Sequence, residues 1–360
     1  MYRRSCLDVA CATLAFGIAT FCVARNSDLP RKSSTPNRDE SYPGVTVQYD
    51  TIGDCCGNRL RLIVTHPQRD SGRIPAIFVV GWLSCDSVEA PPGTTDATQL
   101  VLQAVAKLPG FATMRMDKAG VGDSEGKCGS TDFTAELDSY RRAFRKLRDY
   151  PFVDTNRVFV FGISNGGGFA PLVAEGAPVR GYVVDGGWIK TWYEHMLEIE
   201  RRRLKLSGHP SSEINSMMKS VEALYSAYLL NRESPQQIFE KSPELKKLWE
   251  GEPNQQYGRP VAYYQQLQDL NLMAVWSHVK EPVLALHGEF DWIMSRSDLE
   301  LMAELVNRNA PGAAEFVELP VTGHTFEHYS SMETAFSGMA LPFDDHIAVR
   351  IREWFKKHRE

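Results

Sequence analysis

Short apolar runs alternate along the chain with longer segments in which apolar and polar positions follow a helical period. Eight runs are rich in Val, Ile, Phe or Leu and are bounded by Gly, Pro or Asp, a pattern typical of β-strands. They are VTVQYD, RLRLIVTHP, PAIFVVG, ATMRMD, RVFVFG, VRGYVVDGG, EPVLALHG and AEFVELP. Between them, helices are predicted over residues 96–108, 131–150, 164–174, 295–309 and 343–358. This order predicts an α/β fold with a mostly parallel eight-stranded sheet, helices on both faces and an antiparallel hairpin at one edge.

Residues 188–279 interrupt this alternation, because they contain charged, helical sequence and no convincing strand. One interpretation is an independent helical bundle. The other is a lid inserted between the sixth and seventh strands, above the carboxyl ends where open α/β sheets bind ligands. The position in the chain favours the lid, so the core is expected to comprise residues 42–187 and 280–360.

The first 25 residues predict an export leader. Arg3 and Arg4 form a basic start, an apolar stretch runs from about residue 7 to 23, and the small residues near Ala24 suit cleavage. An uncleaved membrane anchor is the alternative, because the apolar stretch is nearly long enough to span a bilayer. The protein is therefore expected in the periplasm or outside the cell, anchored if the leader stays. Residues 26–41 are polar and Pro-rich, which predicts a disordered linker.

Composition narrows the classes of partner. The 360 residues are 43% hydrophobic, which suits one large domain with an insertion, and the net charge of −5 gives no electrostatic reason to expect nucleic acid. Beyond the leader, no membrane partner is expected.

Four of the seven cysteines lie outside the leader. This is an even number in a chain that is expected to mature in an oxidising compartment, and the spacing of these cysteines matches no metal site. Neither a metal nor an organic cofactor is expected, and small molecules are the natural partners.

One serine stands between glycines directly after the fifth run, in VFVFGISNGGG. Gly162, Ser164 and Gly166 form a G-x-S-x-G pattern with a strand predicted before it and a helix after it. Such a sharp turn admits only small flanking residues and exposes the hydroxyl, while the helix N-terminus favours negative charge on a bound oxygen. The pattern therefore predicts that Ser164 is a nucleophile. The alternative is a tight strand–helix turn without a chemical role.

A serine needs a base, and the best candidate is His324, which follows the eighth strand and a glycine in LPVTGHTFEHY. His328 lies in the same loop but has no glycine to turn it inward. The other histidines, including His195, are expected to be ordinary surface or core residues.

The acid that orients the histidine is predicted to be Asp291, in a tight loop after the strand in PVLALHGEFD. Glu289 and Asp185, which also follow strands, are the alternatives. For the oxyanion, we expect the backbone N–H of Asn165 and one N–H from the loop after the third strand. Trp82 is the first candidate for that second donor, and Leu83 is the alternative.

With these motifs in place, the chain resembles the α/β-hydrolase superfamily from about Tyr42 to His358. It is most similar to exported bacterial hydrolases of the serine aminopeptidase and dienelactone-hydrolase-like branches. The resemblance rests on VVGWLSCDSVE, RMDKAGVGDSEG, GISNGG, PVLALHGEFD and GHTF. The chain departs from the usual His-Gly of the oxyanion loop, where it has Val80-Gly81, and it has Asn165 where many relatives have a bulkier residue.

The resemblance implies that the loops after the third and fourth strands stand near each other on the active-site side. Cys85 and Cys128 fall in those two loops, so a disulfide between them is expected, with two free thiols as the alternative. The segment DKAGVGDSEG, which contains Asp117 and Asp123, is expected to be structural.

The predicted function is acyl transfer to water through an acyl-serine, with a small ester, an amide or a short peptide as substrate. Leu83, Trp188, Trp192 and Tyr193 are candidate pocket residues, and Glu194 is a candidate partner for a substrate amine. Alternatively, these aromatics pack the helical segment onto the core and its glutamates pair with arginines. A carboxylesterase is the main expectation. An exopeptidase would follow if Glu194 faced the pocket, and an acyltransferase could use the same three side chains.

Overall fold

The computed structural model describes residues 23–25, 29, 39–68 and 72–360. Most of the predicted leader and linker therefore lies outside the described residues. Within the predicted linker, Leu29 and Glu40 are described and buried, and Glu40 pairs with Arg115, so this part of the segment is ordered. None of the helices in the described part is both long and apolar enough to cross a bilayer.

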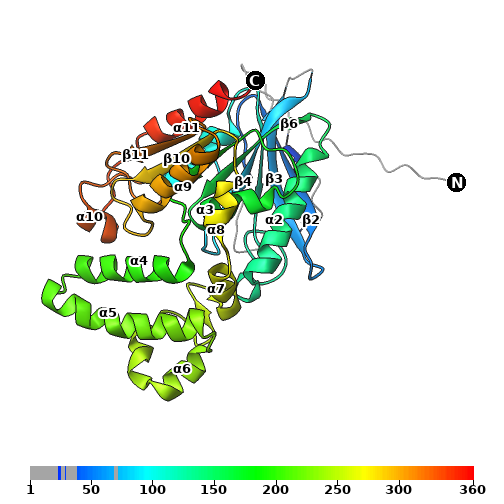
Figure 1. Ribbon diagram of the computed structural model, residues 1–360. Coiled ribbons are helices and arrows are strands. Elements are labelled where there is room, and N and C mark those ends of the chain that lie inside the picture. The colour runs from blue at the N-terminus through cyan, green and yellow to red at the C-terminus, as the bar shows by residue number, and fades with distance from the viewer. Residues whose placement is uncertain (1–22, 26–28, 30–38, 69–71) are drawn as a thin grey trace.

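A nine-stranded sheet forms the centre of the molecule, in the order β1-β2-β3-β5-β4-β6-β7-β10-β11 (Figure 1). All eight predicted strands are present, and β1 adds a ninth within the segment that was assigned to the leader. β3 pairs antiparallel with both β2 and β5, and the remaining neighbours are parallel. The strands are β1 Val23–Arg25, β2 Val45–Gly53, β3 Arg59–Pro67, β4 Ile74–Val80, β5 Ala112–Met116, β6 Val153–Ile163, β7 Gly181–Asp185, β10 Val283–Gly288 and β11 Ala314–Leu319.

Successive side chains of the central strands point to opposite faces of the sheet, so they belong to two separate hydrophobic cores. In β4, Phe78 and Val80 join the larger core, whereas Ile77 and Val79 join the smaller one. Helices α2, α3, α8 and α9 cover the first face, and α1 and α11 cover the second. These helices are α1 Ala97–Ala106, α2 Phe133–Arg148, α3 Asn165–Val173, α8 Leu272–Ser277, α9 Arg296–Asn309 and α11 His346–Lys357. The five predicted helices begin and end within three residues of those observed.

Residues 188–279, the helical insert, lie between β7 and β10, which are neighbours in the sheet. Helices α4, α5 and α6 project below the sheet in Figure 1. The insert contains α4 Trp192–Leu206, α5 Ser211–Tyr225, a π-helical turn Ser226–Leu230, α6 Pro235–Lys241, a 3-10 helix Pro243–Leu248 and α7 Val261–Gln268, in addition to α8. It also contains a two-stranded ribbon, β8 Gln255–Gln256 and β9 Arg259–Pro260, which the sequence did not predict because strands of two residues carry no apolar period.

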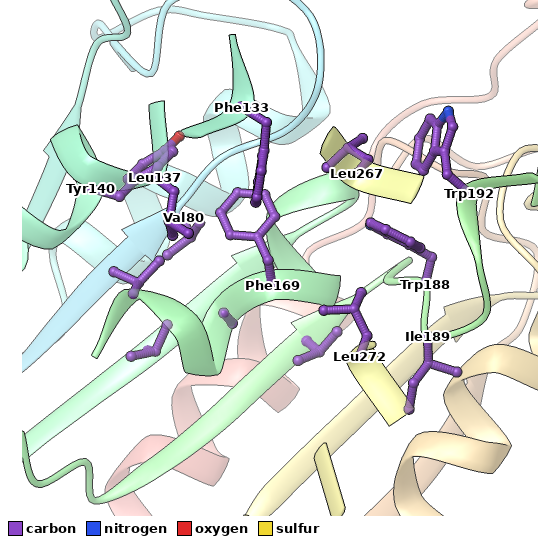
Figure 2. Packing of buried hydrophobic residues seen from close by; sticks show 14 of the residues in the cluster. Val80, Phe133, Leu137, Tyr140, Phe169, Trp188, Ile189, Trp192, Leu267 and Leu272 are labelled. Atoms are coloured by element: carbon purple, nitrogen blue, oxygen red, sulfur yellow. The ribbon is translucent and has the colours of Figure 1, made fainter. Parts of the chain in front are cut away.

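The insert and the sheet share one hydrophobic core. Trp188 and Trp192 meet edge to face with ring centroids 4.9 Å apart, and Trp192 also contacts Tyr264 of α7 at 5.9 Å. Figure 2 shows these tryptophans in the same buried cluster as Phe169 of α3 and Leu267 of α7. Because aromatic rings at this junction bury large apolar surfaces, they hold the insert firmly against α3.

The predicted disulfide between Cys85 and Cys128 is present, and it joins the loop after β4 to the short 3-10 helix Cys128–Ser130. Replacing Cys85 with serine is expected to lower the free energy of unfolding by about 2–4 kcal/mol, because the unfolded chain is no longer constrained. Urea unfolding measures the change. The matched control is Cys55→Ser, which alters an exposed free thiol and should leave the midpoint unchanged. Equal midpoints for both variants, or two free thiols in non-reduced peptides, would contradict the bond.

Candidate active site

Ser164 occupies the sharp turn between β6 and α3. Its φ of 56° and ψ of −126° lie outside the regions that L-residues normally adopt, at a cost on the order of 1–3 kcal/mol. The flanking glycines make the turn possible. A Cβ on Gly162 would lie 2.7 Å from the Cα of Gly167, and one on Gly166 would lie 2.2 Å from the carbonyl oxygen of Gly81.

The structure brings Ser164, His324 and Asp291 together, although they lie far apart in the sequence. The Ser164 Oγ is 2.8 Å from the His324 Nε2, and the His324 Nδ1 is 2.8 Å from the Asp291 Oδ2. Since a carboxylate only accepts hydrogen bonds, Nδ1 carries the ring proton and Nε2 is left to accept the serine proton. This arrangement suits proton removal from Ser164.

Burial and charge act in opposite directions on the imidazole. Burial lowers the pKa of His324, but the negative charge of Asp291 and its hydrogen bond raise it more, so the net pKa lies above the usual value. For Asp291, burial raises the pKa, and the His324 charge, the bond from His324 and the N–H of Met294 together bring it below the usual value. Asp291 Oδ1 accepts the backbone N–H groups of Ile293 and Met294, each at 2.9 Å. Asp291 is therefore held as an anion in a fixed orientation.

The alternative acids and base lie in other environments. Glu289 is exposed and accepts the backbone N–H of Val321. The ring of His328 stacks on Phe343 and His346. Asp185 is buried at the end of β7, and burial raises the pKa of its carboxyl well above the usual value. A raised pKa favours the neutral form of the carboxyl, and that form stabilises an imidazolium less well than an anion does.

A cavity of about 750 Å³ opens beside the serine. Ser164, Asn165 and His324 line it, and so do Trp82 and Leu83 from the loop after β4. Lys118 stabilises the backbone of this loop, because its Nζ donates to the carbonyl oxygens of Trp82 and Ser84. The candidate oxyanion residues thus surround the same space as the candidate nucleophile.

Three of the residues that the sequence suggested for the substrate pocket do not line this cavity. Trp188 is fully buried in the larger core, and its indole N–H donates to Asn165. The Tyr193 hydroxyl pairs with Ser226. Glu194 is exposed and closes a capping box with Thr191 at the start of α4. Its carboxylate accepts the backbone N–H and the hydroxyl of Thr191 at the helix N-terminus, so it is not available to a substrate amine. Trp192 does line the cavity.

Sequence reasoning missed several cavity residues of the insert, and His195 is the clearest case. It was expected to be ordinary, but it lines the cavity, and burial lowers its pKa to about 3, so it stays neutral. Its signal was present in the spacing of α4. The cavity residues Trp192, Met196, Ile199 and Arg203 recur at intervals of three or four, and His195 and Glu200 lie next to members of that series. That spacing defines one helical face, but only the fold shows which face meets the cavity.

No group of three or more His, Cys, Asp or Glu side chains in the described part of the chain could hold a metal ion.

Comparison with known proteins gives a family and a fold. The family described as serine aminopeptidase, S33, matches residues 94–324. A hypothetical protein, PA2218 from Pseudomonas aeruginosa, has a TM-score of 0.54 at 16% identity, covering 92% of this chain and 100% of that one. Est1E from Butyrivibrio proteoclasticus, with ferulic acid bound, has a TM-score of 0.53 at 16% identity and coverages of 86% and 96%.

A third solved structure, the α/β hydrolase GrgF from Penicillium sp. sh18, has a TM-score of 0.50 at 17% identity and coverages of 87% and 99%. At such identities the likeness shows the fold alone, and it confirms the predicted fold class. A search of curated proteins found no match.

Proposed function

The chain belongs to the serine aminopeptidase S33 family of α/β-hydrolases, and from this we propose that it is a serine hydrolase with Ser164, His324 and Asp291 as its catalytic triad. One observation carries the proposal: the continuous hydrogen-bonded chain from Asp291 through His324 to the Ser164 hydroxyl, which ends at the cavity wall. Backbone strain of this kind is costly and clusters at functional sites. A strained serine at a cavity wall therefore supports a catalytic role.

The reaction proceeds by two acyl transfers. The Ser164 oxygen attacks the substrate carbonyl carbon while His324 takes the hydroxyl proton, and Asp291 stabilises the resulting imidazolium. The carbonyl oxygen becomes an anion that accepts backbone N–H groups of Asn165 and of Trp82 or Leu83. His324 then protonates the leaving group as its bond to the acyl carbon breaks. Water, deprotonated by His324, attacks the acyl-serine and releases the acid, and Ser164 regains its proton.

A carboxylesterase is the activity that this cavity supports best. Much of its lining is apolar and includes Trp82, Ile163, Met196, Ile199 and Met294. Binding of an apolar acyl group to such a wall is favourable by on the order of 25 cal/mol for each Å² of apolar surface that is removed from water.

An exopeptidase is the second candidate, because five carboxylate side chains and one guanidinium line the cavity. Two of these carboxylates, Glu200 and Glu250, already pair with Arg203 at 2.6 and 3.3 Å. A substrate amine would have to compete with Arg203 for them, which is why the esterase is preferred. An acyltransferase would use the same triad with an alcohol or amine acceptor in place of water.

The helical insert is proposed to act as a lid, since α4 supplies one wall of the cavity. Export is proposed from the leader pattern, and the Cys85–Cys128 bond supports it because disulfides persist in oxidising compartments.

Two measurements test the function. A fluorophosphonate probe is expected to label the wild type and not Ser164→Ala, because it reacts with an activated serine. A panel of p-nitrophenyl esters beside aminoacyl-nitroanilides is expected to show ester turnover well above anilide turnover. Labelling that persists in Ser164→Ala, or no labelling of either protein, contradicts the triad. Faster anilide turnover would replace the esterase with the exopeptidase.

A further inference from the structure

Asn165 is the residue after the proposed nucleophile, and both polar atoms of its side-chain amide form hydrogen bonds. Its Nδ2 donates to the hydroxyl of Tyr263 at 3.0 Å, and its Oδ1 accepts the indole N–H of Trp188 at 3.0 Å. All three side chains are fully buried. Asn165 is the first residue of α3, so bonds that hold its side chain also hold the peptide whose N–H is the proposed oxyanion donor.

The hydroxyl of Tyr263 continues this chain of bonds to an acidic residue. It accepts from Asn165 and donates its single proton to the Glu136 Oε1 at 3.0 Å. Glu136 lies on α2 and is 2% exposed. Its other oxygen forms an ion pair with Arg259 of β9, whose guanidinium also lies 4.2 Å from the centroid of the Tyr263 ring. A buried carboxylate with this many partners has little freedom to move.

Glu136 also lies near the lysine that contacts the loop of the second expected oxyanion donor. Its Oε1 lies 4.0 Å from the Nζ of Lys118. Lys118 is buried, and its Nζ donates to the carbonyl oxygens of Trp82 and Ser84. Those carbonyls belong to the loop that supplies the second expected oxyanion donor. One carboxylate is therefore hydrogen-bonded to Tyr263, the neighbour of Asn165, and lies 4.0 Å from Lys118, the neighbour of the Trp82–Ser84 loop.

We propose that Glu136 is a positioning residue for the oxyanion hole, holding Asn165 through Tyr263 and the Trp82–Ser84 loop through Lys118. This inference rests on the proposed function. The network joins α2 of the core, α7 and β9 of the insert, and the turn at Ser164, so correct docking of the insert and correct placement of the donors depend on the same bonds. Donors stabilise the transition state only when they are held close to the developing charge, and small displacements are costly.

The test uses two neighbouring tyrosines of α7. Tyr263→Phe removes the hydroxyl between Glu136 and Asn165 and keeps the ring under Arg259. Tyr264→Phe is the matched control, since Tyr264 is equally buried and donates to the backbone oxygen of Gln256, outside the network. Glu136 itself is a poor first target, because removing it leaves Arg259 buried without its partner and endangers folding.

For Tyr263→Phe, kcat on the preferred p-nitrophenyl ester is expected to fall about tenfold to a hundredfold with little change in KM, because only the transition state carries the oxyanion. Affinity for a trifluoromethyl ketone, which forms a tetrahedral adduct on the serine, should fall in parallel. Lys118→Met should act in the same direction through the other donor. Tyr264→Phe should change kcat less than about threefold, although it loses a buried hydrogen bond of similar kind.

Equal kcat and equal ketone affinity in Tyr263→Phe and Tyr264→Phe would overturn the inference, and so would a rise in KM at unchanged kcat. In either case Ser164-dependent turnover by the wild type would leave the proposed function standing. A wild type that neither turns over esters nor reacts with the fluorophosphonate would overturn both. Thermal unfolding of the two variants separates a loss of donor placement from a loss of folded protein.

Discussion

Ser164→Ala is expected to lower kcat for ester hydrolysis by a factor on the order of 10⁶, because alanine has no atom that can form the acyl-enzyme. Substrate binding should persist, since the cavity wall is unchanged apart from one oxygen. The measurement is steady-state turnover of the preferred p-nitrophenyl ester, with product affinity determined by calorimetry.

The control for this variant is Ser139→Ala. Ser139 is also buried, at 3% exposed, but it lies on α2, and its hydroxyl donates to the carbonyl of Ala135 in its own helix. It should retain turnover within about twofold, as substitutions away from functional features usually do. Equal kcat values for Ser164→Ala and wild type would exclude Ser164 as the nucleophile.

Asp291→Asn should reduce kcat by about 10⁴-fold, because the amide can no longer stabilise the imidazolium or enforce the tautomer with the proton on Nδ1. The same change alters the pH profile. Wild-type kcat/KM requires neutral His324 and should rise with pH through a pKa above 6.5, since Asp291 outweighs the lowering effect of burial. Without that negative charge, burial dominates, so the acid limb of the residual activity should move to lower pH.

Asp185→Asn is the matched comparison, because Asp185 is the other buried carboxyl that acts on the pKa of His324. Burial raises the pKa of its carboxyl well above the usual value, which favours the protonated form, and asparagine is similar in shape to that form, so kcat should change far less than in Asp291→Asn. Pre-steady-state and pH-dependent rates on both variants decide between them. A larger loss in Asp185→Asn would make Asp185 the acid of the triad.

The strands and helices predicted for the core agree with the structure, because each of those predictions depended on a local pattern. Eight apolar runs form strands, and five helices appear where the periodic segments lie, because side-chain period is a property of neighbouring residues. The turn at Ser164 was recognisable for the same reason, as Gly162 and Gly166 are needed within two residues of it. Strand β1 and the ribbon β8–β9 were missed, since three and two residues give no period.

The lining of the cavity was less accessible to sequence reasoning. Glu194 and His195 are consecutive. The spacing from Thr191 to Glu194 is a local sign of a capping box, but only the packing of α4 on the core decides that His195 lines the cavity. The network around Glu136 is similar. Its hydrogen bond to Tyr263 spans 127 positions, and that of Tyr263 to Asn165 spans 98.

The sequence by itself therefore determined the order of strands and helices, the serine turn and its expected partners in chain order, because these follow from periodicity and from residues that small turns require. Only the tertiary structure decided which buried polar groups pair and which face of the insert meets the cavity. Such choices depend on the relative placement of whole elements, and a buried carboxylate such as Glu136 acquires its partners only when α2, α7 and β9 have packed together.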